Sequence, residues 1–299
     1  MSMLQDKFSF TSLRIGTLFC LYLGFVCISC SEPTEGCIDA LASNFELEAD
    51  IDCCLIEQEC CCNYPILDLN LFYKGRAEDA LSDPTTNIDL GLFYPLDNLT
   101  DSIRIESFDL FISNIQVTNS TEEDTVQVFE TLELSFLDAE GEEQVASFQD
   151  NIALVSIPTF RFIIGSYRSD NAYDEVLFDI GLRPELAAID PSSVDNEHPL
   201  GDEYTVLFDT TSQRFLTGRI GFTLKRGEEE RAFVQDLDSF RSDSERFMSP
   251  ISIDRGRNLD ILMRINVLDI FKGIIFDVPS EDISLIINEN LTASILILE

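Results

Sequence analysis

The alternation of apolar and polar residues restricts the fold of this chain more than any other feature of its sequence. From Pro65 onward, apolar side chains recur at every second position over many short stretches. A two-residue period places these side chains on one face of a β-strand, whereas an amphipathic helix repeats about every 3.6 residues. The stretches predicted as strands include Ile66–Tyr73, Ile103–Ile112, Val126–Phe129, Leu132–Phe136, Glu175–Ile180 and Ile283–Ile287.

Turn signals separate the predicted strands, and long helical periodicity is absent from the sequence. Only residues 184–188 and 268–272 are predicted as helical turns. Many short strands joined by turns predict an all-β fold, an antiparallel β-sandwich, and we assign most of the 23 Phe residues to its core. The turn signals are Asp83-Pro84, Glu140-Gly141-Glu142, Asp190-Pro191, Arg226-Gly227 and Arg255-Gly256.

The first 30 residues predict an exported lipoprotein. A polar, basic start is followed by Ile15–Ile28, an apolar run of 14 residues. This run is shorter than the roughly 20 residues of a transmembrane helix and is typical of a signal peptide. Ser29 directly before Cys30 matches a lipobox, so we expect residues 1–29 to be removed and Cys30 to be acylated, with an uncleaved membrane anchor as the alternative. The acidic residues 31–35 favour the outer membrane, on its periplasmic or its surface-exposed side.

Six cysteines after Cys30 predict a small disulfide-rich segment in front of the sandwich. Such crowding in an exported chain is typical of disulfides. Zinc is the alternative, but adjacent cysteines lack the usual two-residue gap between zinc ligands. We therefore divide the chain into a signal peptide (1–29), a lipidated, cysteine-rich spacer (30–64) and a β-sandwich (65–299). The six residues are Cys37, Cys53, Cys54, Cys60, Cys61 and Cys62.

Part of the spacer resembles a short module that is repeated in exported bacterial surface proteins. Gly36–Phe45 carries its Gly-Cys-x-Asp and Ala-x-Asn-aromatic pattern. Asp39, Asn44 and Asp52 supply oxygen donors here, so calcium is a candidate ligand. The alternative is that Asp39 and Asn44 accept hydrogen bonds from turn amides. Three donors also fall short of the six to eight oxygens that Ca²⁺ takes.

The charge balance excludes one class of partner. The chain has 55 acidic and 19 basic residues, which give a net charge of −36. Nucleic acid needs a basic surface, so we exclude it as a partner. Anionic lipid would not hold such a chain by charge, so we expect membrane attachment through the acyl chains. The acidic residues keep the protein soluble or attract cations, and composition does not choose between the two.

Several short motifs, taken in order, resemble the MbnP-like family over residues 66–298. They are an alternating strand with a glycine loop, a Ser-Asn-Ile signature, a Gly-x-Tyr turn before a strand ending in Ile-Gly, and His-Pro-Leu. The family comprises exported proteins named for a copper-binding member associated with methanobactin. The resemblance implies a β-sandwich that binds copper with a tryptophan oxidised to kynurenine by a dihaem peroxidase-like partner. The motifs stand here as Leu67–Gly75, Leu110–Val117, Gly165–Tyr167, Phe178–Leu182 and His198–Leu200.

The sequence lacks the side chains for that copper chemistry. It has no tryptophan, so the kynurenine ligand cannot form, and Gly201–Asp209 stands where the family has its Trp-rich segment. His198 is its one histidine, whereas copper is normally held by several imidazole or sulfur ligands. Met248 and Met263 are isolated in sequence. We expect His198 to close a turn before Pro199, with metal ligation as the alternative.

The leading functional hypothesis is a non-catalytic, lipid-anchored binding or interaction protein rather than an enzyme. A Ser-His-Asp triad would depend on His198 alone, and no glycine-rich phosphate loop occurs. A second hypothesis is a metal-handling protein that holds copper or another cation through His198 with Asp202 or Glu203. A third is a structural or adhesive surface protein that calcium stiffens.

Overall fold

The computed structural model describes residues 33–53, 61–75, 88–97, 100–122, 124–126, 128–137, 143–277 and 280–298. The signal peptide, Cys30, Cys54, Cys60 and the turn signals at 83–84 and 140–142 lie outside these residues. No helix in the described ranges is long and apolar enough to cross a membrane. The chain divides into a small unit, residues 1–38 with 46–62, and a large unit, residues 39–45 with 63–299.

The small unit is held together by disulfides. Cys37 bonds to Cys62 and Cys53 bonds to Cys61, which confirms that this segment forms disulfides. The amide of Glu46 also donates to the carbonyl of Cys37 at 2.8 Å. Disulfides persist in oxidising compartments, so these bonds indicate a protein of the extracytoplasmic space. Two short parallel strands complete the unit, β1 (Glu35–Gly36) and β2 (Ile51–Asp52).

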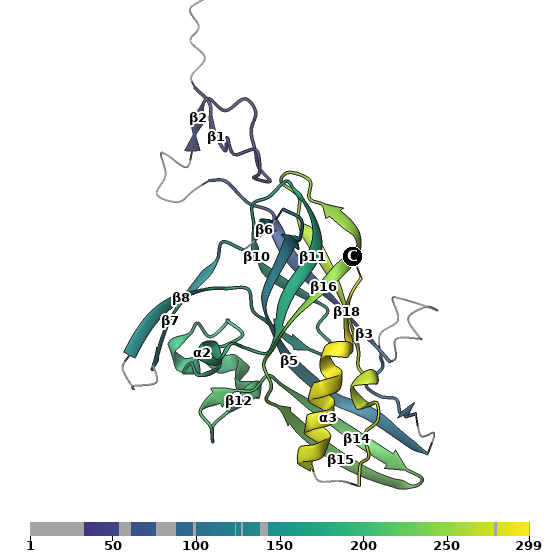
Figure 1. The fold of residues 1–299 in the computed structure, drawn as a ribbon. Coiled ribbons are helices and arrows are strands. Elements are labelled where there is room, and N and C mark those ends of the chain that lie inside the picture. Colours follow the sequence, from purple (N-terminus) through teal and green to yellow (C-terminus); the bar gives the residue numbers. More distant parts are fainter. Residues whose placement is uncertain are drawn as a thin grey trace, which may run out of the picture. The chain divides into compact units, whose positions relative to one another are not determined.

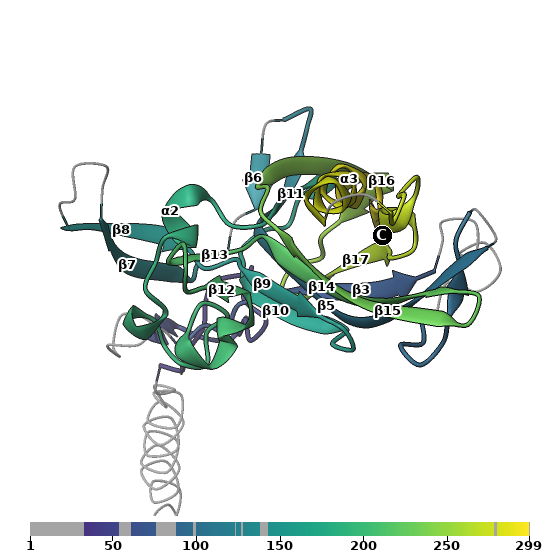
Figure 2. The ribbon, with the colours of Figure 1, turned by 90° about the horizontal axis from the view of Figure 1, so that it is seen from below.

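The large unit is built from two β-sheets (Figures 1 and 2). Neighbouring strands are antiparallel except β3 and β17, which run parallel. The smaller sheet has the order β10 (Arg161–Ser166), β3 (Ile66–Lys74), β17 (Leu259–Asn266), β18 (Ile295–Ile297). The larger sheet has the order β15 (Glu229–Leu237), β14 (Gly218–Arg226), β5 (Asp101–Asn119), β11 (Ala172–Ile180), β16 (Arg241–Ser252). Three further strands pair with β5: β4 (Tyr94–Pro95), β6 (Asp124–Val126) and β9 (Ala153–Ser156).

The main core lies between the inner faces of these sheets. Leu67, Leu69 and Leu71 of β3 are at most 1% exposed and belong to one cluster with Ile103 and Ile105 of β5. These side chains follow the two-residue period seen in the sequence. The prediction of a mostly β fold, sandwich-like and preceded by a disulfide-rich segment, is therefore confirmed.

One predicted strand is wrong. Residues 283–287 lie in α3 (Ser280–Ala293), a helix that contacts β15 and β18. Ile283, Ile287 and Leu291 recur every four residues and are buried, while Leu285 between them is 59% exposed. A four-residue spacing is the helical period, which a five-residue apolar cluster is too short to reveal. Figure 2 shows α3 end-on.

Other local predictions hold with smaller changes. β6 spans Asp124–Val126, so only Val126 of the predicted strand 126–129 lies in it, and Val128 and Phe129 lie outside any strand. The helical turns are confirmed as α2 (Pro184–Ala187) and η5 (Asp269–Phe271). Arg226-Gly227 closes the β14–β15 hairpin, where Gly227 has φ +63°, and Arg255-Gly256 forms a turn with φ +67° at Gly256. The Asp190-Pro191 signal begins the 3₁₀-helix η3 (Pro191–Ser193), which the Asp190 side chain caps.

A second, smaller core lies under a hairpin. Leu134 of the hairpin packs in one cluster with Phe111 of β5, Leu186 of α2 and Phe215. The hairpin lies beside α2 in both views (Figures 1 and 2). The remaining elements of this region are the hairpin strands β7 (Thr131–Leu137) and β8 (Glu143–Gln149), η4 (Asp202–Leu207), β12 (Phe208–Asp209) and β13 (Arg214–Phe215).

Candidate functional site

A β-bulge interrupts strand β5 at its centre. Gln116 pairs with Leu177 and Ser113 with Asp179, so two residues of β5 stand opposite one residue of β11. The first of them, Asn114, has φ +54°, a left-handed conformation that asparagine tolerates better than most residues. Bulges turn side chains in directions that a regular strand does not allow and are frequent beside functional sites.

A hollow of about 340 Å³ lies at this bulge, and we refer to it as the Asn114 hollow. Ligand sites in proteins usually measure about 300–1,000 Å³, so it lies near the lower limit. The buried Leu186 and the half-buried Phe148 form an apolar part of its wall. The other lining residues are polar: Ser113, Asn114, Gln116, Ser147, Gln149, Asn151 and Arg183.

Several polar atoms in this lining form no hydrogen bond with the described residues. The Asn151 side chain donates from Nδ2 to the carbonyl of Ile115 at 3.3 Å, while its Oδ1 accepts no hydrogen bond from the described residues. Gln116 Nε2 donates to Asn114 Oδ1 at 2.6 Å. That bond leaves Asn114 Nδ2 and Gln116 Oε1 without a partner in the described part of the chain. Asn151 is only 3% exposed, but its Oδ1 is not fully buried and can be reached from the hollow.

The electrostatics of the hollow are nearly neutral. Arg183 is the one formally charged residue among those that line it. Its Nε lies 3.4 Å from Oδ2 of Asp179, whose side chain is 2% exposed, so the two charges are matched. Half of the Arg183 side chain is exposed, and its terminal nitrogens bond to none of the described residues.

Gly181 fixes the backbone that leads to Arg183. Its φ of +92° suits glycine, and a Cβ there would lie 2.7 Å from Oγ1 of Thr217. Its carbonyl accepts a hydrogen bond from the Ser113 hydroxyl at 2.7 Å, and its amide donates to the carbonyl of Phe111 at 2.8 Å. The bulge in β5 and the segment before α2 are therefore tied together beside the hollow.

His198 closes a turn, as predicted, and both of its ring nitrogens are engaged. The amide of Leu200 donates to Nδ1 at 3.1 Å, so the neutral ring carries its proton on Nε2, which lies 2.9 Å from Oδ1 of Asp150. Asp150 directly precedes Asn151, so His198 supports the rim of the hollow. The described residues contain no group of three or more His, Cys, Asp or Glu that could hold a metal ion. Asp202 and Glu203 are exposed at the start of η4, and metal binding with His198 stays a prediction.

Asp39 has several partners in the large unit. Its carboxylate accepts hydrogen bonds from the amide of Leu41 at 3.0 Å and the hydroxyl of Tyr64 at 2.9 Å, and it lies 3.0 Å from Nη2 of Arg168. Burial raises the pKa of Asp39, but these hydrogen bonds and the guanidinium outweigh it, so the pKa lies below its ordinary value.

The other two calcium candidates lie in different units. Asn44 belongs to the large unit, where its Oδ1 accepts from the amide of Asn63 at 2.7 Å. Asp52 belongs to the small unit, in β2. The contact of Asp39 with Leu41 corresponds to the turn-amide alternative, whereas Asn44 accepts from an amide 19 residues away. Calcium binding stays a prediction.

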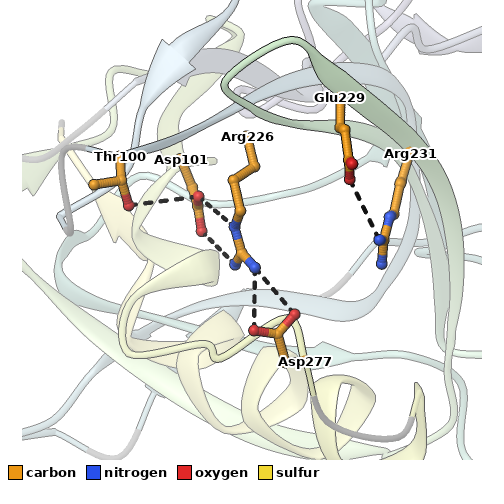
Figure 3. A network of polar contacts seen from close by, with 6 residues as sticks. All are labelled: Thr100, Asp101, Arg226, Glu229, Arg231 and Asp277. Carbon is orange, nitrogen blue, oxygen red and sulfur yellow. Dashed lines mark hydrogen bonds and ion pairs between the residues drawn. The ribbon is translucent and has the colours of Figure 1, made fainter.

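A second hollow, of about 290 Å³, lies around Arg226, and we refer to it as the Arg226 hollow. Arg226 donates to both carboxylate oxygens of Asp101 at 2.8 Å and to Asp277 at 3.0 and 3.1 Å (Figure 3). These hydrogen bonds raise the pKa of Arg226 further above its ordinary value. The guanidinium joins the end of β14 to the start of β5 and to the segment before α3. We refer to this network as the Arg226 clamp, because it holds these three segments together.

The residues of the Asn114 hollow are inconspicuous in the sequence. One signal was present: the stretch Leu110–Val117, quoted for the family resemblance, contains Ser113, Asn114 and Gln116 among apolar residues. Polar residues at the centre of a strand are a reason to look for a bulge. Residues 147–151 and 183 carried no comparable signal.

Comparisons with known proteins add little. No protein-family model matches the chain, and no curated protein matches it either. Among solved structures, the chain shows a weak similarity to MbnP from Methylosinus trichosporium, with 10% sequence identity and a TM-score of 0.37. The match covers 71% of this chain and 78% of that chain.

Proposed function

We propose that this chain is a lipid-anchored, extracytoplasmic binding protein without catalytic activity, and that its ligand occupies the Asn114 hollow. The observation that carries this proposal is the unsatisfied Oδ1 of Asn151, on a residue only 3% exposed. This oxygen is not fully buried, so a donor group of a ligand in the hollow can reach it and replace water there.

The surroundings of this atom favour binding. The bulge, Gly181 and the Ser113 hydroxyl hold the lining in one conformation before any ligand arrives. A lining that is ordered in advance loses less conformational entropy when it binds. Nothing in this arrangement requires a nucleophile or a general base.

A ligand screen with two matched variants tests the binding role. Ser147 lines the hollow, whereas Ser135 is an exposed serine on the partner strand of the same hairpin and is not among the residues that line the hollow. Small polar compounds of neutral, anionic and cationic type are screened by thermal unfolding against the wild type, Ser147→Trp and Ser135→Trp. A ligand at 100 times its Kd stabilises by about 2.7 kcal/mol, or roughly 5–10 °C in Tm for a protein of this size.

We expect at least one compound to stabilise the wild type and Ser135→Trp but not Ser147→Trp. Compounds that stabilise all three proteins equally, or none of them, would overturn the assignment of the hollow as a binding site.

The anchor has a separate test. We expect the mature chain to begin at an acylated Cys30 and to sediment with membranes through its acyl chains. The acidic protein has no electrostatic attraction to anionic lipid, so the acyl chains alone would hold it there. Intact mass of the mature protein reports the cleavage site and acyl chains directly. Cys30→Ser should move the protein to the soluble extracytoplasmic fraction, and a mass that retains residues 1–29 would contradict the lipoprotein assignment.

A further inference from the structure

The charge of the Asn114 hollow points to an uncharged ligand. A protein with a net charge of −36 repels anions, and its one cation in the hollow, Arg183, is already matched by Asp179. None of the described residues that line the hollow carries a carboxylate that could attract a cation. Neither an anionic nor a cationic ligand would therefore gain electrostatic stabilisation in this hollow.

The hydrogen-bonding groups point to a ligand that both donates and accepts. Asn114 Nδ2 and the terminal nitrogens of Arg183 are donors, whereas Asn151 Oδ1 and Gln116 Oε1 are acceptors. None of them has a partner within the described ranges. A carboxylate or phosphate would satisfy only the donors and would leave two amide oxygens facing it. A hydroxyl group donates one hydrogen bond and accepts others, so neighbouring hydroxyls fit a mixed set.

The apolar wall restricts the ligand further. Phe148 is half-buried beside the hollow and Leu186 is buried, so one side of the ligand meets carbon rather than polar atoms. A pyranose ring has C–H groups on its faces and hydroxyls around its edge, which matches an aromatic wall beside a mixed polar lining. The volume of about 340 Å³ is near the lower limit for ligand sites, which suits one sugar unit of a larger glycan.

We infer that the Asn114 hollow binds a neutral saccharide, with Asn114, Gln116, Asn151 and Arg183 hydrogen-bonding its hydroxyls and Phe148 packing on a ring face. This inference rests on the proposed binding function and adds the chemical class of the ligand.

Isothermal titration of the mature, full-length chain tests it. The probes are glucose, galactose, mannose, N-acetylglucosamine and their disaccharides. A parallel set of free amino acids, short neutral peptides and dicarboxylates serves for comparison. We expect at least one saccharide to bind, with an affinity that changes less than about 2-fold between 50 and 500 mM salt because the ligand is uncharged.

Variants then locate the binding. Asn114→Asp exchanges the amide nitrogen for an oxygen of the same size and keeps a residue that tolerates the left-handed conformation, so it should weaken saccharide binding about 3- to 10-fold or more. Ser147→Trp should abolish binding, and Ser135→Trp should leave it unchanged. Circular dichroism and Tm establish that each variant is folded.

The outcomes separate the two claims. Peptides or dicarboxylates that bind in place of saccharides, with the same dependence on Ser147, would overturn the saccharide inference and leave the binding function standing. Saccharide binding that Ser147→Trp does not affect would overturn the placement in this hollow. Failure of every probe would count against both the inference and the proposed function.

Discussion

The Asn114 hollow and the Arg226 hollow are similar in size but differ in how their polar groups are satisfied. In the Arg226 hollow the guanidinium is bonded to Asp101 and Asp277, and the Asp101 side chain is 1% exposed. In the Asn114 hollow two amide oxygens and one amide nitrogen bond to none of the described residues. Polar groups that are paired within the protein stabilise the fold. Polar groups that are ordered but unpaired can instead form hydrogen bonds with a ligand. The following substitutions test this comparison, from the largest expected effect to the smallest.

Phe271→Ala should cause the largest loss of stability. Phe271 lines the Arg226 hollow, is 2% exposed and lies edge-on to Phe222 with ring centroids 4.8 Å apart. Removing a buried phenyl ring from a packed core costs about 3–5 kcal/mol. Phe148→Ala in the Asn114 hollow, where the ring is only half-buried, should cost clearly less. Urea unfolding of both variants measures the difference. Equal decreases in the free energy of unfolding would contradict a structural role for the Arg226 hollow.

Arg226→Met should lower the Tm by a smaller but clear amount. The change removes the guanidinium that bonds to both oxygens of the buried Asp101 carboxylate, and a buried charge that loses its ion-pair partner is destabilising. Arg231→Met is the matched control, because Arg231 lies in the same hairpin and pairs with Glu229 on the surface, where both side chains are mostly exposed (Figure 3). A Tm for Arg226→Met as high as that of the control would mean that the clamp contributes nothing.

Substitutions of Asn114 should separate stability from binding. Asn114→Gly should leave the free energy of unfolding unchanged or raise it by up to about 1 kcal/mol, because glycine adopts φ +54° without strain. Asn114→Val should lower it by about 1–2 kcal/mol, since a branched residue is strained there. Both variants should lose ligand affinity. If Asn114→Gly unfolds much more easily than the wild type, the side chain serves the fold rather than a ligand.

Asp39 gives the smallest effect, and it depends on pH. Its pKa is lowered in the folded protein, so its contribution to stability is present above the ordinary carboxyl pKa of about 3.8 and is lost as the pH falls through the lower, folded value. Asp39→Asn lacks this contribution at every pH. The stability gap between wild type and Asp39→Asn should therefore be constant near pH 7 and narrow below about pH 3.8. Urea unfolding at pH 7 and pH 3 tests this, and a gap of equal size at both values would refute the assignment.

Much of the fold could be predicted from the sequence because strands carry their signal locally. β3 and β11 follow the alternation seen at Ile66–Tyr73 and Glu175–Ile180, and both strands lie where they were expected. The strand predicted at 283–287 was wrong. The helical spacing of the buried residues of α3 becomes visible only when Leu291, outside this apolar cluster, is included. The parallel pairing of β3 with β17 could not be read either, since it joins segments about 190 residues apart.

The candidate site was harder to predict, because residue type does not reveal partners. His198 and Asp39 were selected for their chemistry, and the structure gives each of them protein partners. The amides of Asn114 and Asn151 look ordinary in sequence, and only their lack of partners distinguishes them. That property depends on residues that the chain brings together from distant positions.

The sequence by itself determined the mostly β fold and the disulfide-bonded segment, because periodicity and cysteine crowding act between near neighbours in the chain. The tertiary structure alone decided where β5 bulges, that residues 280–293 form a helix, and which polar atoms stay without partners. Whether a polar atom finds a hydrogen-bond partner depends on the packing of the whole molecule. The Asn151 side-chain amide donates to the carbonyl of Ile115, 36 residues earlier, and no local sequence pattern indicates that its oxygen has no partner among the described residues.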